Sequence, residues 1–408
     1  GVCRRPHHFR RGAVFIRVVR WHRQPARQYN HWPVVLSGTR CAVGDGVKMP
    51  DTVAMEPIIE TKGLTKLFPV RHGVWGKPTA QVRAVDRIDL QVMPGETLGV
   101  VGESGCGKTT LGRLILRLLD ATSGEVYFRG NNLGDLAPPE MRRLRRKMQI
   151  VFQDPYSSLN PRMRVGTLIG EGLKIHGMAR GGQVATRVEE LLAKVGLPGS
   201  AAARYPHEFS GGQRQRIGIA RALAVEPEFV VADEPVSALD VSVQAQIVNL
   251  LQDIQRDLGL TYVFIAHDLS VVRHIADRVA VMYLGRVVEL ASRDQLYGSP
   301  SHPYTRALLS AVPVADPSVT RHRVVLAGDV PSPSRVPSGC PFHPRCPEAI
   351  DACSRVVPEL ADPGDGRRVA CLLRTPQEGE GPREDFDLIR IDPHRESAQA
   401  TRHTHQES

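Results

Sequence analysis

Apolar and polar residues alternate in two runs near the start of the central part of the chain. The runs cover residues 58–67 and 82–92, and the second ends at the turn-forming pair Pro94-Gly95. Alternation with a period of two is typical of strands that have one buried face. We therefore expect antiparallel strands here, and a further strand at residues 124–128.

Four later segments are apolar without interruption, as expected for strands that are buried on both faces. Two helical runs, at residues 111–119 and 217–224, lie between them. Strands that alternate with helices predict an α/β fold. The four apolar segments cover residues 98–101, 150–152, 229–232 and 262–266.

The segment between the two halves of this core has a helical pattern. Residues 165–199 contain several amphipathic pieces and predict a separate helical subdomain. The basic run at residues 142–147 looks like a nucleic-acid patch, but Met141 and Leu144 belong to an amphipathic helical period. We interpret this run as the solvated face of a helix.

The positive charge of the chain is concentrated at its start. The net charge is +10, and residues 1–50 hold ten Arg and Lys against Asp45 alone. The rest of the chain is close to neutral, so a basic partner-binding face on the main domain is not indicated. Residues 1–50 lack an amphipathic period and the apolar core of a secretory signal. We expect a disordered basic tail there, or a region upstream of a start at Met49 or Met55.

Membrane and redox signals are weak in this sequence. No stretch of 18 apolar residues occurs, so we do not expect the chain itself to cross a membrane. Seven cysteines in 408 residues, scattered except for a late group, are typical of a reducing cytoplasm.

Phosphate binding explains the stretch that follows the first buried strand. Residues 102–109 read Gly-Glu-Ser-Gly-Cys-Gly-Lys-Thr, which is the pattern G-x-x-x-x-G-K-[ST]. The glycines let the backbone turn tightly and aim its N–H groups inward, and the helix that follows adds the positive end of its dipole. Lys108 would then reach the β- and γ-phosphates, Thr109 would hold Mg²⁺, and Thr110 would meet the α-phosphate. The alternative is a Gly-rich turn without a ligand.

Three further segments carry residue types that suit the γ-phosphate. The stretch Ser210-Gly211-Gly212-Gln213 opens a helix, where a hydroxyl and backbone N–H groups would bind phosphate. A helix cap explains the serine, but a cap alone does not call for two glycines and a glutamine. Asp233 and Glu234 end a buried strand, and are placed to hold Mg²⁺ and to polarise an attacking water. His267 ends another strand, where an α/β sheet gathers its ligand groups.

An aromatic residue, Phe68, directly follows the first alternating run. An aromatic ring here could stack on an adenine, with Val85 lining the other side of the base. The alternative is that Phe68 is an ordinary core residue.

In their order and spacing, these motifs resemble those of the ATP-binding cassette (ABC) ATPases. The sequence resembles the subfamily of oligopeptide and dipeptide permeases at three places: Phe209, residues 154–161 and the Ser-His-Pro-Tyr-Thr element at 301–305. Residues 233–240 resemble the second, F-type, of its two ATPase subunits. The resemblance covers residues 57–373.

The resemblance implies a P-loop NTPase fold with a mixed sheet core, an antiparallel β subdomain, a helical subdomain and a small Cys-containing extension. The expected parts are a basic segment at 1–55, the ABC ATPase domain at 56–299, the extension at 300–375 and a disordered polar tail at 376–408. The helical subdomain is expected at about 155–225 of the ATPase domain.

The resemblance also assigns roles to single residues. Glu234 is expected to align the attacking water, His267 to contact the γ-phosphate, and Gln153 to sense Mg²⁺ and link to the helical subdomain. Lys108 completes the catalytic set, and Thr109, Gln153 and Asp233 are expected to hold Mg²⁺. The expected nucleotide-binding residues are Phe68, Val85, Gly102, Glu103, Ser104, Gly105, Cys106, Gly107, Lys108, Thr109, Thr110, Gln153, Asp233, Ser210, Gly211, Gly212, Gln213 and Asp240.

In this family the phosphate loop of one subunit faces the Ser-Gly-Gly-Gln signature of another across a dimer. The resemblance therefore implies a second ABC ATPase subunit, with a heterodimer as the expected arrangement and Asp240 communicating between the two sites. It also implies two transmembrane permease subunits, an extracytoplasmic substrate-binding protein, and a peripheral position on the cytoplasmic face of the cell membrane. The implied function is ATP hydrolysis that drives import of dipeptides or oligopeptides, with no nucleic-acid partner.

Other functions stay open. The same machinery could import nickel or another small solute, because the sequence does not specify the cargo. A soluble cassette protein acting on ribosomes or DNA usually carries two cassettes or a long coiled coil, and this sequence has neither. A simple P-loop kinase or GTPase would not need the Ser-Gly-Gly-Gln stretch.

Four of the seven cysteines, Cys340, Cys346, Cys353 and Cys371, lie late in the chain. Their spacing does not follow C-x-x-C, so ordinary thiols are one alternative. Residues 331–363 are rich in proline and poor in periodic apolar residues, and small segments of that kind commonly need a metal or a cross-link. In some peptide-permease ATPases such cysteines hold a [4Fe–4S] cluster. The resemblance implies the same structural centre here, with Zn²⁺ as the alternative.

Overall fold

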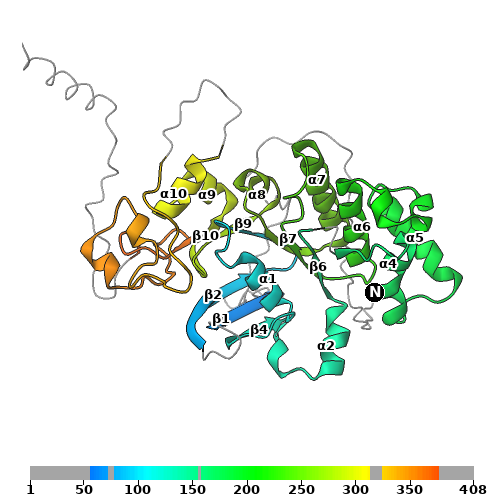
Figure 1. The fold of residues 1–408 in the computed structure, drawn as a ribbon, viewed down its shortest axis with the longest axis horizontal. Coiled ribbons are helices and arrows are strands. Elements are labelled where there is room, and N and C mark those ends of the chain that lie inside the picture. The colour runs from blue at the N-terminus through cyan, green and yellow to red at the C-terminus, as the bar shows by residue number, and fades with distance from the viewer. Residues whose placement is uncertain (1–55, 72–77, 155–157, 313–323, 376–408) are drawn as a thin grey trace, which may run out of the picture. The chain divides into compact units, whose positions relative to one another are not determined.

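A computed structural model describes residues 56–71, 78–154, 158–312 and 324–375 (Figure 1). The predictions for residues 1–55 and for the polar tail at 376–408 lie outside the described residues. Within the described residues, no helix has the length and apolar character that a membrane span requires.

The core of the protein is a mixed sheet of seven strands in the order β11-β10-β9-β3-β8-β7-β6. Strands β9, β3, β8, β7 and β6 are parallel, whereas β10 is antiparallel to β9 and β11 is antiparallel to β10. The predicted α/β core is confirmed. The strands are β3 (Thr97–Val101), β6 (Met148–Val151), β7 (Phe229–Asp233), β8 (Thr261–Ile265), β9 (Arg278–Tyr283), β10 (Arg286–Ser292) and β11 (Arg368–Val369).

The central strands are apolar throughout because both faces of the sheet are covered. In β8, Tyr262 and Phe264 pack into one hydrophobic cluster, and Val263 and Ile265 pack into a second cluster on the other face. Each fully buried side chain of this size contributes about 1.5–3 kcal/mol relative to exposure. The uninterrupted apolar runs of the sequence therefore identified buried parallel strands correctly.

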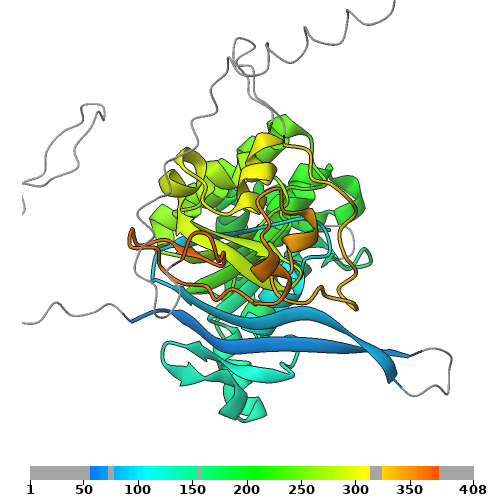
Figure 2. The same cartoon turned by 90° about the vertical axis from the view of Figure 1, so that its left-hand side faces the viewer.

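A second, antiparallel sheet has the strand order β2-β1-β4-β5. Its strands are β1 (Ile59–Arg71), β2 (Pro78–Val92), β4 (Ser123–Phe128) and β5 (Asn131–Asn132). Figure 2 shows β1 and β2 as two long neighbouring strands. The three predicted strands are confirmed, although β1 and β2 extend further than the alternating pattern indicated. Register shifts interrupt the pairing of β1 with β2 between Thr61 and Leu67 and between Val70 and Arg71.

Helices α4, α5 and α6 pack against one another and form the helical region that the sequence predicted. Residues 165–199 hold two helices because Gly177 and Gly181 have positive φ values of 66° and 54° and interrupt the segment. The α-helices of the described residues are α1 (Lys108–Ile115), α2 (Pro138–Arg145), α4 (Val165–Ile175), α5 (Gly182–Lys194), α6 (Gly211–Leu223), α7 (Val241–Leu258), α8 (Leu269–Ile275), α9 (Arg293–Gly298) and α10 (Pro303–Ser310).

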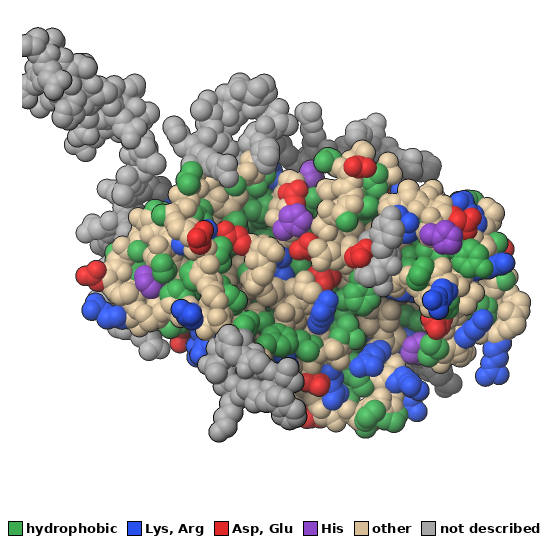
Figure 3. Space-filling view, in the orientation of Figure 1, with side chains coloured by type: hydrophobic (Ala, Val, Ile, Leu, Met, Phe, Trp, Pro, Cys, Tyr) green, Lys and Arg blue, Asp and Glu red, His purple; other side chains and the backbone are tan. Residues whose placement is uncertain are grey.

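The basic run at residues 142–147 lies mostly on α2. Met141 is buried, while Arg142 and Arg143 are exposed. Figure 3 shows basic side chains over this part of the molecule. The structure therefore confirms an amphipathic helix with a solvated basic face.

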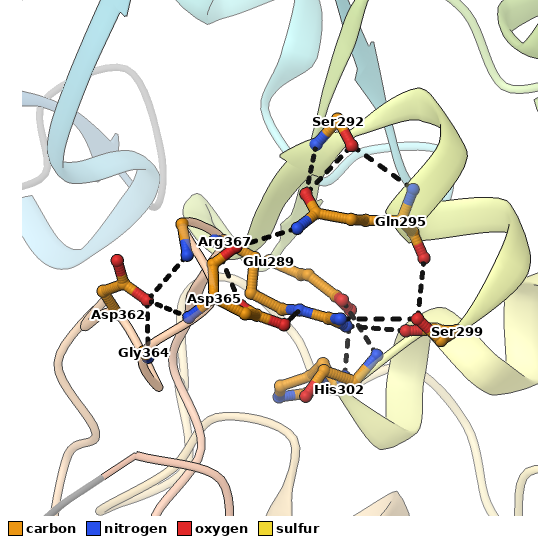
Figure 4. A network of polar contacts seen from close by, with 11 residues as sticks. Glu289, Ser292, Gln295, Ser299, His302, Asp362, Gly364, Asp365 and Arg367 are labelled. Atoms are coloured by element: carbon orange, nitrogen blue, oxygen red, sulfur yellow. Dashed lines mark hydrogen bonds and ion pairs between the residues drawn. The ribbon is translucent and has the colours of Figure 1, made fainter. Parts of the chain in front are cut away.

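The C-terminal region is joined to the large sheet through β11, which pairs with β10. A polar network reinforces this connection (Figure 4). The carboxylate of Glu289, which is fully buried, accepts hydrogen bonds from the backbone N–H groups of Ser301 and His302 at 2.8 and 2.9 Å. Arg367 donates to the carbonyl oxygen of Ser299 at 2.6 Å. These contacts fix the start of α10 and hold residues 365–369 beside it.

Candidate functional site

The phosphate loop connects β3 to α1, and close packing shapes its backbone. Gly102 and Gly107 have φ values of 153° and 105°. A Cβ atom on Gly102 would lie 2.2 Å from the carbonyl oxygen of Met282, and one on Gly107 would lie 2.0 Å from that of Ala84. No side chain fits at such distances. The glycines are therefore required by the neighbouring backbone as well as by the turn.

Lys108 is buried at the first position of α1, and its ammonium group lies against the loop. It donates hydrogen bonds to the carbonyl oxygens of Gly102 and Glu103, at 2.8 and 3.0 Å. Both partners are neutral. A buried ammonium group whose partners are neutral favours the approach of an anion, because burial in a low dielectric strengthens the attraction. This arrangement suits a phosphate group.

Thr109 connects the phosphate loop to the end of β7. The hydroxyl of Thr109 donates a hydrogen bond to Oδ1 of Asp233 at 2.9 Å. Asp233 is only 2% exposed; burial raises the pKa of its carboxyl, and the Thr109 hydrogen bond opposes that rise. A hydroxyl and a carboxylate are hard oxygen donors, and Mg²⁺ usually takes one or two such protein ligands beside phosphates and waters. The residues therefore fit Mg²⁺.

Three polar side chains from the ends of three neighbouring strands meet beside this pair. Oε2 of Glu234 accepts a hydrogen bond from Nε2 of Gln153 at 2.9 Å and lies 3.3 Å from Nδ1 of His267. The three residues follow β6, β7 and β8, whose carboxyl ends lie at one edge of the parallel sheet. A hollow of about 30 Å³ lies beside Glu234 and His267 and has room for one water molecule.

The backbone at Glu234 is held in an uncommon conformation. Its φ is 45°, in a region that residues with a Cβ rarely occupy. Its N–H donates to the carbonyl oxygen of Ile265 at 3.0 Å, and its own carbonyl oxygen accepts from the hydroxyl of Ser237 at 3.1 Å. These contacts fix the backbone from which the carboxylate projects.

The Ser-Gly-Gly-Gln stretch begins α6 and has a local structural role. Ser210 Oγ accepts from the N–H of Gln213 at 3.4 Å, and Oε1 of Gln213 accepts from the N–H of Ser210 at 3.0 Å. This is a reciprocal capping box. A Cβ on Gly212 would lie 2.4 Å from Cγ1 of Val243. The expectation that a cap does not call for the glutamine was therefore wrong, since a capping box uses both Ser and Gln.

The signature and the phosphate loop occupy different parts of this chain. Helix α1 packs against β1, β2, β7 and β8, whereas α6 packs against β6, α4, α5 and α7. Ser210 and Gln213 are exposed, as is Asp240 at the start of α7. Among the described residues, no hydrogen bond joins residues 210–213 to the phosphate loop. The signature is thus open to a partner molecule.

The two residues expected at the adenine have different environments. Phe68 is 36% exposed, and the ammonium of Lys66 lies 5.3 Å from the centre of its ring. Its ring is therefore accessible and is not part of the core. Val85 is fully buried in the core cluster beneath the antiparallel sheet, so it presents no surface to a base. The expectation for Val85 is corrected on this ground.

Two contacts to the phosphate loop were missed by the sequence analysis. The hydroxyl of Tyr304 accepts a hydrogen bond from the N–H of Glu103 at 2.9 Å. The guanidinium group of Arg345 binds both carboxylate oxygens of Glu103, at 2.9 and 3.2 Å. Tyr304 belongs to the Ser-His-Pro-Tyr-Thr element, which the sequence singled out only as a mark of the subfamily. No motif or periodicity indicated Arg345.

The four late cysteines lie near one another as free thiols. Burial raises the pKa of Cys340 to about 11, and the neighbouring thiols of Cys353, Cys371 and Cys346 add to the rise. A raised pKa favours the neutral thiol, whereas a metal ligand is a thiolate. Within the described residues, no group of three or more His, Cys, Asp or Glu side chains is arranged to hold a metal ion. The geometry gives no support to the predicted iron–sulfur or zinc centre.

Two family models match this chain. The model described as "ABC transporter" matches residues 85–237, which include the phosphate loop, the signature and Glu234. The model described as "Oligopeptide/dipeptide transporter, C-terminal region" matches residues 288–353, which include Tyr304 and Arg345.

Proteins with similar sequences align with most of this chain. The oligopeptide transport ATP-binding protein AppF of Bacillus subtilis is 52% identical over 321 residues, covering 78% of this chain and 98% of that protein. The probable peptide ABC transporter ATP-binding protein y4tS of Sinorhizobium fredii is 54% identical, covering 79% and 91%. Among solved structures, a dimeric post-hydrolysis state of the ATP-binding cassette MJ0796, bound to ADP and phosphate, is similar with a TM-score of 0.52. It is 31% identical and covers 58% of this chain and 98% of that one.

Proposed function

The chain belongs to the ATPase subunits of ABC transporters, and on this premise we propose that it couples ATP hydrolysis to the import of dipeptides or oligopeptides. The match to the oligopeptide/dipeptide C-terminal region supports this cargo class, as do the names of its relatives. Import of nickel or another small solute by the same machinery is the alternative. The proposal of ATP hydrolysis rests on the Glu234 carboxylate, which is held between Gln153 and His267 beside Asp233.

The triphosphate of ATP would lie in the loop at the start of α1. Inward-pointing N–H groups and the positive end of the helix favour its negative charge. The ammonium of Lys108 would exchange its two carbonyl partners for phosphate oxygens. Thr109, Asp233 and Gln153 would hold Mg²⁺, which neutralises charge on the phosphates when bound.

Glu234 is the residue that we assign to the attacking water. Both of its side-chain contacts, with Gln153 and His267, use Oε2. Oε1 is thereby left to accept a hydrogen bond from a water in the adjoining hollow. A carboxylate in this position can take the proton of the water as it attacks the γ-phosphate. Gln153 and His267 would keep the carboxylate turned toward it.

The proposed assembly pairs this subunit with a second ATPase subunit, so that the signature of each closes the nucleotide site of the other. Two transmembrane permease subunits, an extracytoplasmic binding protein and a position on the cytoplasmic face of the membrane complete the proposal. Support comes from the exposed faces of Ser210 and Asp240 and from the dimeric solved relative. Affinity purification from solubilised membranes tests it. Recovery of hydrophobic permease subunits supports import, and recovery of ribosomes instead contradicts it.

Changing Ser210 to Arg tests whether the signature acts on the partner's site. We expect the isolated chain to bind ATP as the wild type does, because residues 210–213 do not touch its own phosphate loop. We expect ATP turnover at the partner's site to be lost, because the bulky cation fills the face that would approach the γ-phosphate. ATP binding to the single chain and turnover of the paired complex are the measurements.

The matched control for this experiment is Ser292→Ala. Ser292 and Gln295 form the same kind of capping box on α9, so the control loses a helix cap that is worth about 1 kcal/mol. Equal loss of ATP binding in the isolated Ser210→Arg chain would place Ser210 in its own site and contradict the assignment.

We also propose a structural metal centre at the four cysteines, which is supported by the family resemblance and not by the geometry of the described residues. Anaerobically purified protein is expected to be brown, to absorb near ~400 nm and to bleach on reduction, as [4Fe–4S] clusters do. Colourless protein with one equivalent of zinc would assign the site to zinc. Metal-free protein of unchanged stability would show that these are ordinary thiols.

A further inference from the structure

Glu103, the second residue of the phosphate loop, is held by two residues of the C-terminal region. We call Tyr304 and Arg345 the Glu103 clamp. Tyr304 accepts the backbone N–H of Glu103, and Arg345 binds its carboxylate through two nitrogen atoms. A bidentate guanidinium–carboxylate pair is among the strong, directional contacts in proteins. The side chain of Arg345 is only 9% exposed and that of Glu103 is 27% exposed, so solvent screens this pair weakly.

Both residues of the clamp are anchored by packing. The ring of Tyr304 is fully buried, and its centre lies 4.7 Å from that of Tyr283 and 5.3 Å from that of Phe342. Phe342 directly precedes the short 3-10 helix His343–Arg345, which presents the guanidinium group. The buried carboxylate of Glu289 fixes the start of α10, the helix that carries Tyr304 (Figure 4). The clamp therefore holds the loop from a rigid support.

The Glu103 clamp and Lys108 contact the same residue of the phosphate loop. The carbonyl oxygen of Glu103 accepts a hydrogen bond from the ammonium of Lys108, so the clamp and Lys108 hold the same residue. The carboxylate of Glu103 is an anion within a loop that receives the negative triphosphate. Arg345 is the cation that faces this carboxylate. Without it, Glu103 would repel the phosphates and its loop position would be less defined.

We propose that Arg345 is a positioning residue of the nucleotide site, which neutralises Glu103 and fixes the phosphate loop for ATP. The C-terminal region then contributes to ATP binding in this subunit, through Arg345. The inference rests on the ATPase function proposed above. It differs from an ordinary structural ion pair in one respect, because the two partners have opposite effects on ATP binding.

The test compares two variants that break the same ion pair. Arg345→Met leaves an uncompensated anion beside the phosphates, and we expect the dissociation constant for Mg-ATP to rise about tenfold, which corresponds to about 1.4 kcal/mol. Glu103→Gln leaves the cation of Arg345 unopposed, and we expect ATP to bind about threefold more tightly. Combining both changes should give binding at least about threefold tighter than Arg345→Met alone. The full chain is used for equilibrium binding, and unfolding in denaturant is followed in parallel.

Two further variants complete the design. Arg345→Lys keeps the charge and should bind ATP more tightly than Arg345→Met does. Arg306→Met removes a 3.0 Å ion pair with Glu348 in the same region without touching the phosphate loop, and should leave the dissociation constant unchanged.

The outcomes distinguish failure of the proposed role of Arg345 from failure of the proposed ATPase function. Wild-type affinity in Arg345→Met overturns the inference, as does equal weakening of ATP binding in Arg345→Met and Glu103→Gln, which would mark an ordinary structural pair. If Arg345→Met does not fold, equal weakening in Glu103→Gln and Arg345→Lys overturns it. Failure of the wild-type chain to bind ATP contradicts the proposed function instead.

Discussion

Replacing Glu234 by Gln is expected to stop ATP turnover while ATP binding remains. The amide keeps the shape of the side chain and one oxygen, but it cannot take a proton from the attacking water. Because this carboxylate is held by Gln153 and His267 and Glu234 lines a water-sized hollow, we expect kcat to fall by about 10²-fold or more. The dissociation constant for Mg-ATP should change little, since Glu234 does not belong to the phosphate loop.

Single-turnover and steady-state hydrolysis by the purified transporter complex are the measurements. Glu228→Gln is a matched control, because Glu228 directly precedes β7 at the opposite end from Glu234 and pairs with Arg129 and Lys147. It should turn over ATP at the wild-type rate. Near-normal turnover by Glu234→Gln would remove its assignment as the base.

The sequence predicted the parts of the site that follow from local chemistry and from the ends of buried strands. Asp233 and Glu234 follow one uninterrupted apolar run, and His267 directly follows another. In a parallel sheet the carboxyl ends of such strands lie at one edge, so residues far apart in sequence meet. The structure brings Glu234 and His267 within 3.3 Å of each other, as that topology requires.

What the sequence could not predict depends on packing between distant segments. Val85 lies in an alternating run, and only the pairing of β1 with β2 shows that it belongs to the core. Arg345 is separated from Glu103 by 242 residues and carries no motif of its own. The Ser210–Gln213 capping box is local and could have been found from the pattern Ser-x-x-Gln.

Replacing Gly107 by Ala is expected to destabilise the protein and to weaken ATP binding. The φ of Gly107 is 105°, which is unfavourable for a residue with a Cβ. The added Cβ would lie 2.0 Å from the carbonyl oxygen of Ala84, which is backbone and cannot move away as a flexible side chain could. Strain and overpacking together predict a loss of about 3 kcal/mol in the free energy of unfolding.

Gly130→Ala separates these two causes. Gly130 has a φ of 74° in the turn between β4 and β5, and nothing lies within 4 Å of an added Cβ. Its change therefore adds conformational strain alone, and we expect a loss of about 1–2 kcal/mol without an effect on ATP binding.

In Gly107→Ala the phosphate loop must shift away from the carbonyl oxygen of Ala84. The neighbouring residue Cys106 opposes this shift, because its carbonyl oxygen accepts a hydrogen bond from the N–H of Gly285 at 2.9 Å. The N–H groups that face the phosphates then move, so the dissociation constant for ATP should rise more than about tenfold. Denaturant unfolding and equilibrium ATP binding measure both effects. If Gly107→Ala costs no more than Gly130→Ala and binds ATP as the wild type does, close packing against Ala84 does not shape the phosphate loop.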